Sequence, residues 1–274
     1  MRVAARQVSA LDGTTKLLLR CADGALSEAV VLFNKNRVSA CLSSQSGCAC
    51  GCAFCATGRL GFARNLTAEE IITQYEQCRL VAPPESIVFM GMGEPLLNWE
   101  NLKQAILALC DQRGVNFPQS RITVSTVGIT PVMRELAHSE LKVRLAVSLV
   151  TADENERAKL VPVSARYPLG EIIAAARHYC EERKRQVFFE YILLGGLNDS
   201  PEDARKLLSL IDGVDCKINL IPYNAAGGGD FAPPSAEKAM EFQKTIMAAG
   251  IRAYLRREKG SDIKAACGQL AGAA

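Results

Sequence analysis

The feature that most constrains this chain is the short stretch from Cys48 to Cys55, which reads Cys-Ala-Cys-Gly-Cys-Ala-Phe-Cys. Hydrophobic packing gives no reason for cysteines at this density. The neighbouring glycines, Gly47, Gly51 and Gly58, allow a tight backbone around a bound group. The stretch therefore predicts a loop that holds a metal ion or an iron–sulfur cluster.

The spacing of the cysteines distinguishes these two cases. Cys48, Cys52 and Cys55 form a C-x3-C-x2-C set, whereas a structural zinc site takes two separated ligand pairs, and no second C-x2-C or H-x3-H pair follows. Thiolates are soft ligands that select iron–sulfur clusters, and a [4Fe–4S] cluster held by three cysteines keeps one iron open. We expect such a cluster, with zinc or simple redox chemistry as the alternative and Cys50 as a bystander.

Composition sets wider limits on the class of protein. The chain has 274 residues, 49% of them hydrophobic, which is enough for one large α/β domain. The net charge of +3 permits nucleic-acid binding without arguing for it. No secretory leader pattern and no apolar stretch of about 18 residues occurs. With 11 cysteines, we therefore expect a cytoplasmic protein in a reducing compartment and no membrane partner.

The order of patterns along the chain predicts the fold class. Strand-like runs at 16–21, 29–33 and 38–42, with a turn at 34–37, predict a hairpin that leads into the cysteine loop. We expect 1–40 to be a short N-terminal β extension and 41–274 to be the core domain. Beyond the loop, strands alternate with helices, which predicts parallel strands curling into a whole or partial barrel with its chemistry at the strand C-termini. The expected strands are 86–90, 121–125, 143–148, 186–193, 217–221 and 252–255, and the expected helices start at Thr67 or span 102–110, 131–137, 169–182, 201–211 and 235–249.

Several of these strands end in polar residues or glycine. Gly91-Met-Gly-Glu94, Ser125-Thr126, Ser148 and Asn224 each follow a different strand. Any one of them alone reads as a turn or a cap, but four on one edge of a sheet predict a binding face. The glycine run 227–229 predicts a mobile surface loop.

Four strings carry a resemblance to a known family: Cys41-Leu-Ser-Ser-Gln-Ser-Gly-Cys48, Phe89-Met-Gly-Met-Gly-Glu-Pro-Leu-Leu-Asn98, Asn219-Leu-Ile-Pro-Tyr-Asn224 and Asp262-Ile-Lys-Ala-Ala-Cys-Gly-Gln-Leu270. From about Glu28 to Leu270 the chain resembles the radical S-adenosylmethionine (SAM) adenine methyltransferases of RNA, which comprise RlmN-like enzymes and their Cfr-like relatives. The resemblance implies a partial (β/α)6-type TIM-like barrel with a short N-terminal β extension.

The resemblance also implies roles for individual residues. Cys48, Cys52 and Cys55 would hold the [4Fe–4S] cluster, and two SAM molecules would be used per turnover. SAM would be bound through its amino group by Gly93 and Glu94, and through its remainder by Ser125, Ser148 and Asn224.

Three further residues would carry the methyl transfer. Cys267 would be S-methylated by a first SAM, and radical cleavage of a second would activate that methyl group for addition to the base. Glu28 would accept the ring proton, and Cys41 would release the product through a transient disulfide with Cys267. Without the resemblance, Cys267 reads as a small buried hydrophobic residue, and a glutamate that opens a strand, as Glu28 does, is commonplace.

The implied function is methylation of an adenine ring carbon, C2 favoured over C8, in rRNA and/or tRNA, with an electron donor such as flavodoxin or ferredoxin. A radical SAM enzyme for a small molecule or peptide, and an RNA-binding or redox-sensing protein with a vestigial cluster, are the alternatives. The intact set of Glu28, Cys41 and Cys267 disfavours both.

The chain departs from the family pattern at two places. Val150 stands where the family usually has histidine, and 27 residues precede Glu28 where the family usually has a longer segment with a helical accessory domain. We therefore expect the barrel face itself to hold RNA. The candidate phosphate contacts are Arg59, Arg64 and the runs 183–185 and 256–259, each of which also reads as a solvated helix or loop end.

Overall fold

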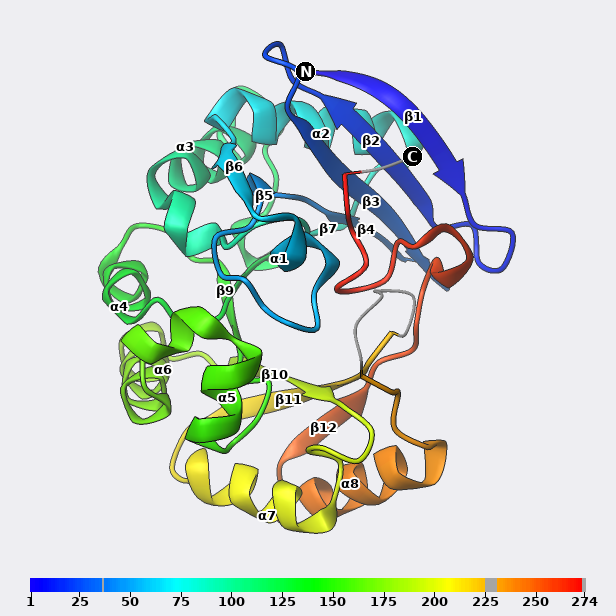
Figure 1. Ribbon diagram of the computed structural model, residues 1–274. Helices are drawn as coiled ribbons and strands as arrows, with labels where there is room; N and C mark the ends of the chain where they lie inside the picture. Colours follow the sequence, from blue (N-terminus) through cyan, green and yellow to red (C-terminus); the bar gives the residue numbers. More distant parts are fainter. Residues whose placement is uncertain (36, 225–230, 273–274) are drawn as a thin grey trace.

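One large sheet organises the molecule. The structure, a computed structural model, describes residues 1–35, 37–224 and 231–272. Within these residues ten strands pair in the order β1-β2-β3-β4-β7-β8-β9-β10-β11-β12 (Figure 1). The strands are β1 (Arg2–Val8), β2 (Thr15–Arg20), β3 (Leu26–Asn34), β4 (Arg37–Cys41), β7 (Ser86–Phe89), β8 (Ile122–Thr126), β9 (Arg144–Ser148), β10 (Val187–Leu193), β11 (Cys216–Pro222) and β12 (Arg252–Leu255).

The strands from β7 to β12 form the parallel unit that the sequence predicts, since each pairs in parallel with the next. β4, predicted only as part of the hairpin, adds one more parallel strand beside β7. Helices lie outside the curved sheet in Figure 1, as right-handed crossovers require. They are α2 (Ala68–Val81), α3 (Trp99–Cys110), α4 (Thr130–His138), α6 (Leu169–Arg183), α7 (Pro201–Leu210) and α8 (Ala236–Ala248).

The N-terminal strands extend this sheet in antiparallel fashion. β1 pairs with β2, β2 with β3, and β3 with β4, so the predicted hairpin into the cysteine loop is confirmed. The pattern had not predicted β1, because this edge strand is largely exposed and carries few apolar residues. The pattern also missed β5 (Gln45–Gly47), β6 (Phe62–Asn65), α1 (Ala56–Leu60) and α5 (Glu154–Leu160), which are all short.

Local sequence signals fix the helix starts. The side chain of Thr67 accepts a hydrogen bond from Glu70 N, and the Glu70 carboxylate accepts one from Thr67 N, which confirms the predicted capping box of α2. The glycine run 227–229 lies outside the described residues. No helix within the described residues combines the length and the apolar character that crossing a bilayer takes.

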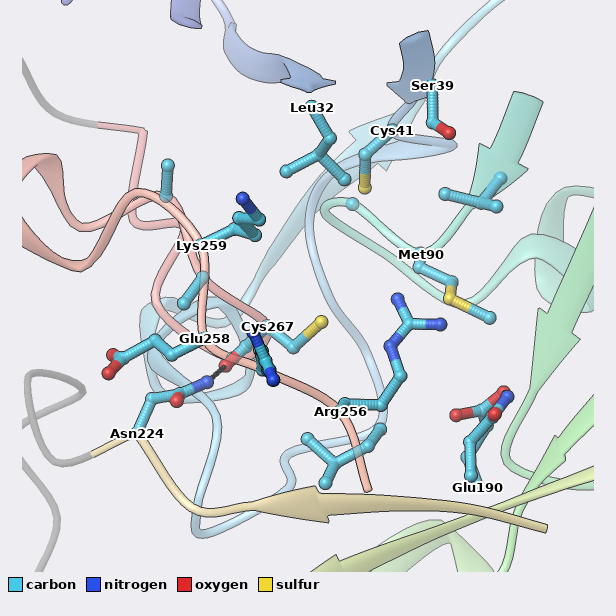
Figure 2. A pocket seen from close by; sticks show the side chains of 18 of the residues that line it. Leu32, Ser39, Cys41, Met90, Glu190, Asn224, Arg256, Glu258, Lys259 and Cys267 are labelled. Carbon is cyan, nitrogen blue, oxygen red and sulfur yellow. Dashed lines mark hydrogen bonds between the residues drawn. The ribbon is translucent and has the colours of Figure 1, made fainter. Parts of the chain in front are cut away.

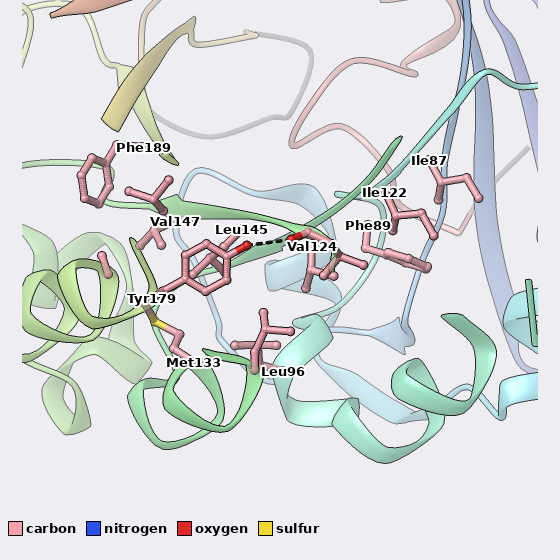
Figure 3. Packing of buried hydrophobic residues seen from close by; sticks show 14 of the residues in the cluster. Ile87, Phe89, Leu96, Ile122, Val124, Met133, Leu145, Val147, Tyr179 and Phe189 are labelled. Atoms are coloured by element: carbon pink, nitrogen blue, oxygen red, sulfur yellow. Dashed lines mark hydrogen bonds between the residues drawn. The ribbon is translucent and has the colours of Figure 1, made fainter. Parts of the chain in front are cut away.

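Alternation along the strands separates the core from the barrel interior. On β8, Ile122 and Val124 are buried beneath the helices, whereas Thr123 and Ser125 line cavities on the other face. Figure 3 shows Val124, Leu145 and Val147 packed with Met133 and Tyr179 of the helical layer. The outer face of the sheet thus supplies the hydrophobic core, and its inner face is left for polar chemistry.

The C-terminal segment, residues 256–272, returns to the cysteine loop. Ala56 N donates to Gly268 O at 2.7 Å, and Thr57 Oγ1 donates to Leu270 O at 2.6 Å. Ser9 Oγ donates to Asp262 Oδ1 at 2.7 Å, which ties the same segment to the N-terminal extension. Segments distant in sequence therefore meet above the strand C-termini (Figure 1).

Tyr179 provides a test of this packing. Its hydroxyl donates to Val143 O at 2.7 Å inside the core, where the Tyr179 side chain is 1% exposed (Figure 3). Tyr179→Phe leaves that buried carbonyl without this donor, so we expect the free energy of unfolding to fall by about 1–3 kcal/mol. Tyr254→Phe, at a 46% exposed position, is the matched control and should leave it nearly unchanged. Urea unfolding measures both, and equal effects would contradict the assignment.

Candidate active site

The cysteine loop follows β5 and packs against the strand C-termini. Cys52 is buried and Cys48 and Cys55 are half-buried, in an apolar cluster with Phe54, Leu160, Val161 and Tyr223. In addition to burial, the charges of Cys48 and Cys55 raise the pKa of Cys52, and that of Cys48 raises the pKa of Cys55, so the three thiols lie near one another. In the part of the chain that the structure describes, no group of three or more His, Cys, Asp or Glu side chains has the geometry to hold a single metal ion.

Close backbone packing fixes the shape of this loop. A Cβ atom at Gly58 would lie 2.8 Å from the backbone N and O of Cys52, so only glycine fits there. Burial raises the pKa of Cys55, and backbone N–H groups of Gly58 and Thr57 oppose the rise. The start of α1 therefore turns hydrogen-bond donors toward a cysteine that the sequence predicts as a cluster ligand. The extra cysteine, Cys50, is buried, and its side chain lowers the pKa of the neighbouring Cys48.

A buried arginine, Arg157, lies near the cysteine loop. The Arg157 guanidinium is wholly withdrawn from solvent and donates to Leu149 O at 3.0 Å and to Val127 O at 2.5 Å. Its positive charge opposes the rise that burial causes in the pKa of Cys52. Sequence reasoning missed Arg157, because an arginine on a short polar helix carries no signal of burial.

Val150, which stands where the family usually has histidine, lines neither of the two cavities that Cys267 lines. It is buried in the apolar cluster of the cysteine loop, and its φ of 71° is unusual for a β-branched residue. Its carbonyl accepts from Asn198 Nδ2 at 2.8 Å, which holds the loop after β9 in this conformation. The Val150 side chain therefore packs within the apolar cluster of the cysteine loop and lines neither cavity.

A small cavity of about 150 Å³ lies at the strand C-termini beside the cysteine loop. The five residues that the resemblance assigns to SAM binding all line it, together with Cys55 and Cys267. They come from the ends of four strands of the parallel sheet, β7, β8, β9 and β11, or from the loops that follow: Gly93, Glu94, Ser125, Ser148 and Asn224. The strand-end pattern thus brings together the residues that it singled out.

Glu94 is the buried acid of this small cavity. Its Oε2 accepts from Val127 N at 2.9 Å and its Oε1 accepts from Leu96 N at 3.0 Å. Burial raises the pKa of Glu94 to about 7, although these hydrogen bonds act in the opposite direction. A cationic group placed beside this carboxylate would favour its charged form.

A second, larger cavity of about 1230 Å³ adjoins the first. Cys267 lines both cavities and Cys41 lines the larger one. Figure 2 shows the two sulfurs directed into the same space from different segments. Asn224 Nδ2 donates to Cys267 O at 3.0 Å, which links the strand-end asparagine to the cysteine backbone.

Electrostatics couple the two cysteines. Burial raises the pKa of Cys41, and the neighbouring Cys267 raises it further. Desolvation also raises the pKa of Cys267, even though its side chain reaches the solvent-accessible cavity. The positive charge of Arg256 opposes both shifts. Both thiols therefore rest protonated, with one cation placed to stabilise a thiolate on either.

Of the three residues predicted to carry the methyl transfer, Glu28 lines neither cavity, whereas Cys41 lines the larger one and Cys267 lines both. It is wholly buried on β3, with Oε1 3.2 Å from Lys16 Nζ. Its Oε2 accepts from Ala271 N at 2.8 Å and from Gly272 N at 3.1 Å. Leu270, the residue before these donors, lines the larger cavity, so the C-terminal segment stands between Glu28 and that space.

Two buried polar residues of the cavity wall escaped the sequence analysis as site residues. Glu190 lines both cavities from the middle of β10, and Asn219 of β11 donates to its Oε1 at 2.7 Å. A signal was present, since each places a polar side chain between two buried apolar residues of its strand.

The predicted basic contacts divide into two groups. Arg64 pairs with Asp23 and Glu70, and Arg183 donates to carbonyls at the end of α4, so both have structural partners. Arg59 donates to Ala53 O at 3.1 Å. The run 256–259 lines the larger cavity, where the structure adds three arginines that the sequence analysis had not singled out: Arg37, Arg121 and Arg144.

Similarity to known proteins places this site in a family. A sequence model of the Radical SAM superfamily matches residues 42–208. The chain is 44% identical over 277 residues to the dual-specificity RNA methyltransferase RlmN of Anaeromyxobacter sp. (strain Fw109-5), covering 97% of this chain and 73% of that protein. The chain belongs to the RlmN family of radical SAM methyltransferases. The resemblance drawn from the four sequence strings is thereby confirmed.

Further relatives agree with this membership. The RlmN of Lawsonia intracellularis (strain PHE/MN1-00) is 44% identical over 272 residues, covering 94% of this chain and 76% of that protein. A crystal structure of a radical SAM methyltransferase from Sphaerobacter thermophilus superposes with a TM-score of 0.96 at 42% identity, covering 99% of this chain and 81% of that chain. The predicted α/β radical SAM fold is therefore confirmed.

RlmN-family membership brings with it a [4Fe–4S] cluster and SAM as cofactors. The residues present fit both groups. Three mutually close thiols in an apolar surrounding are the donor set that a cluster takes, and the three-cysteine spacing leaves one iron for another ligand. Glu94 offers a buried carboxyl to the ammonium group of an amino acid such as SAM.

The raised pKa of Glu94 predicts that the free energy of unfolding depends on pH. From its ordinary value of 4.5 up to about 7, the folded protein keeps a proton that the unfolded chain has lost. The free energy of unfolding of the cofactor-free protein should therefore fall as pH rises through this window, by an amount on the order of 3 kcal/mol. Glu94→Gln should flatten this part of the pH profile, measured by urea unfolding. A variant profile that keeps the wild-type slope would show that another group causes it.

Proposed function

We propose that this chain methylates a ring carbon of adenine, C2 in preference to C8, in rRNA and/or tRNA, through a methyl group carried on Cys267. The observation that carries the proposal is the position of Cys267, which lines both the small cavity with Glu94 and the large cavity with Cys41. A carrier between a methyl donor and a large substrate needs access to both. The preference for C2 rests on the Pro95 to Asn98 run, which resembles the C2 enzymes.

Family membership supports RNA methylation as the activity, since the relatives are dual-specificity RNA methyltransferases. When bound, the cluster and SAM supply the methyl group and the radical chemistry that an electrophilic ring carbon demands, with an electron donor such as flavodoxin or ferredoxin. We assign Cys48, Cys52 and Cys55 to the cluster. Gly93, Glu94, Ser125, Ser148 and Asn224 are proposed to orient SAM at the strand ends.

Cys267 and Cys41 then act as a carrier and a resolving thiol. The hydrogen bond from Asn224 to Cys267 O holds the carrier's backbone at the junction of the cavities. When the methyl carbon is joined to the base, attack by the Cys41 sulfur on the Cys267 sulfur forms the sulfur–sulfur bond. The same step breaks the bond from the Cys267 sulfur to carbon, and the electron pair leaves with the carbon. Arg256 favours the thiolate that this attack needs.

Glu28 is proposed to accept the ring proton, and the structure sets a condition for this. Its Oε2 is occupied by the N–H groups of Ala271 and Gly272. Ala271 and Gly272 must therefore withdraw from Glu28 before the carboxylate faces the substrate, while the hydrogen bonds at Gly268 and Leu270 keep Cys267 in place.

The walls of the larger cavity suit a polyanion. Arg37, Arg121 and Arg144 stand at the starts of β4, β8 and β9, exposed, and none of them forms an ion pair with the described residues. Arg257 and Lys259 line the same space. Arg257 and Lys259 follow β12 at the edge where Cys267 lies, and the three arginines line the opposite end of the same cavity. Arginine and lysine side chains bind phosphates, and a target adenine must be unpaired or flipped to reach Cys267.

The test is anaerobic incubation of the cluster-loaded protein with SAM, a reductant and total RNA from a strain that lacks such enzymes. Nucleoside mass spectrometry against 2-methyl- and 8-methyladenosine standards should show new 2-methyladenosine. Cys267→Ala should abolish the product, and Cys110→Ala, which removes a half-buried cysteine of α3, should retain it.

Other outcomes of this experiment separate the alternatives. An 8-methyladenosine peak would move the chain to the Cfr-like chemistry. Cleavage of SAM to 5′-deoxyadenosine without any methylated nucleoside would refute the RNA assignment and favour a non-RNA substrate for the same radical machinery.

A further inference from the structure

Glu190 is a buried acid that the methyl-transfer chemistry above does not use. It lies in the middle of β10, is 3% exposed, and lines both cavities. Asn219 Nδ2 donates to its Oε1 at 2.7 Å, so the neighbouring strand fixes the orientation of the carboxyl group. Burying a carboxyl costs free energy unless hydrogen bonds or an opposite charge compensate, and one hydrogen bond satisfies only part of its capacity.

Arg256, which follows β12, lines the larger cavity as well. Its backbone N donates to Leu220 O at 2.8 Å just after β12, which anchors the residue at the cavity wall. Figure 2 shows the guanidinium projecting into the cavity, with Glu190 and Cys267 on different sides of it. Arg256 influences the pKa of Glu190, Cys41 and Cys267, so all three lie near it.

The two side chains lie near each other at the wall of the larger cavity without pairing. Their charges interact, yet among the described residues no ion pair within 4.0 Å joins Arg256 to Glu190. A hydrogen-bond donor and a hydrogen-bond acceptor therefore lie next to each other, beside the cysteine that carries the methyl group. Leu32 and Met90 add apolar surface to the same cavity, which suits a flat ring.

We propose that Glu190 and Arg256 form the site that recognises the target adenine, with the carboxylate accepting from the N6 amino group and the guanidinium donating to N1. Adenine presents a donor and an acceptor side by side on this edge, whereas inosine and guanine present the reverse, an O6 acceptor and an N1–H donor. Against this pair the reversed edge meets repulsion at both positions. This inference rests on the proposed function and names how its substrate base is selected.

The pose has a consequence for the reaction. Because N1 adjoins C2 in the ring, a base held at N1 by Arg256 presents C2 toward Cys267, the near neighbour of Arg256. Donation of a hydrogen bond to N1 also withdraws electron density from C2, which makes that carbon a better acceptor for an incoming carbon radical. The recognition pair thus selects the base and its reacting atom together.

The test compares two short oligouridine RNAs of equal length and charge, one with a central adenosine and the other with a central inosine. Binding is followed by fluorescence anisotropy, without reductant and with saturating SAM so that the small cavity is filled. Wild-type protein should bind the adenosine RNA about ten-fold more tightly, the discrimination that a well-placed donor and acceptor pair gives.

Three variants make the test specific. Glu190→Gln, whose amide presents a donor as well as an acceptor, should bring the ratio close to one. Arg256→Lys keeps the charge but loses the planar fork, so it should reduce the ratio while leaving the salt dependence of binding unchanged. Arg134→Lys, on the exposed side of α4, should keep the wild-type ratio. Circular dichroism checks that each variant is folded.

The outcomes separate this inference from the proposed function. Equal binding of the two RNAs by wild-type protein, or full discrimination in folded Glu190→Gln and Arg256→Lys, overturns the recognition pair even when total RNA is methylated. Wild-type protein that discriminates the two RNAs, with variants that do not, supports the pair as an adenine site. If the same wild-type protein methylates no RNA adenine, the proposed methylation is refuted while the adenine site stands.

Discussion

The site depends on one physical constraint, which is that the C-terminal segment must be held against the cysteine loop. Two short hydrogen bonds, from Ala56 N to Gly268 O and from Thr57 Oγ1 to Leu270 O, provide that contact on either side of Cys267. They join residues more than 200 positions apart in the sequence. Without them the methyl-carrying cysteine would have no fixed position relative to the loop that binds the cluster.

The barrel supplies the second requirement, which is an interior that tolerates polar groups. Because strand side chains alternate, the core residues of β8 and β9 pack beneath the helices while Ser125 and Ser148 face inward. The chain can therefore place charged and nucleophilic groups inside the sheet without weakening its core. Glu94 and Glu190 are both buried on this inner side, where hydrogen bonds from Val127 N and Asn219 Nδ2 hold their orientation.

How much of this could be read from the sequence depends on the range of each signal. The Thr67 capping box and the alternation of strands and helices are local patterns, and the structure confirms the elements that they predict. The five strand-end residues also meet in one cavity, because parallel strands bring their C-termini to one edge. Glu28 shows the limit, since its cover by Ala271 and Gly272 comes from the other end of the chain. Arg256 and Glu190 are likewise brought together only by the pairing of β11 with both β10 and β12.

The central claim is that Cys267 carries the carbon to the base and Cys41 releases it. The direct measurement is incubation of folded Cys41→Ala with SAM, reductant and RNA, followed by denaturing electrophoresis and peptide mass spectrometry. A covalent protein–RNA adduct should accumulate, with adenosine attached to the peptide that contains Cys267. Cys110→Ala should release methylated RNA as the wild-type protein does. Free methylated RNA from Cys41→Ala, with no adduct, would contradict the account.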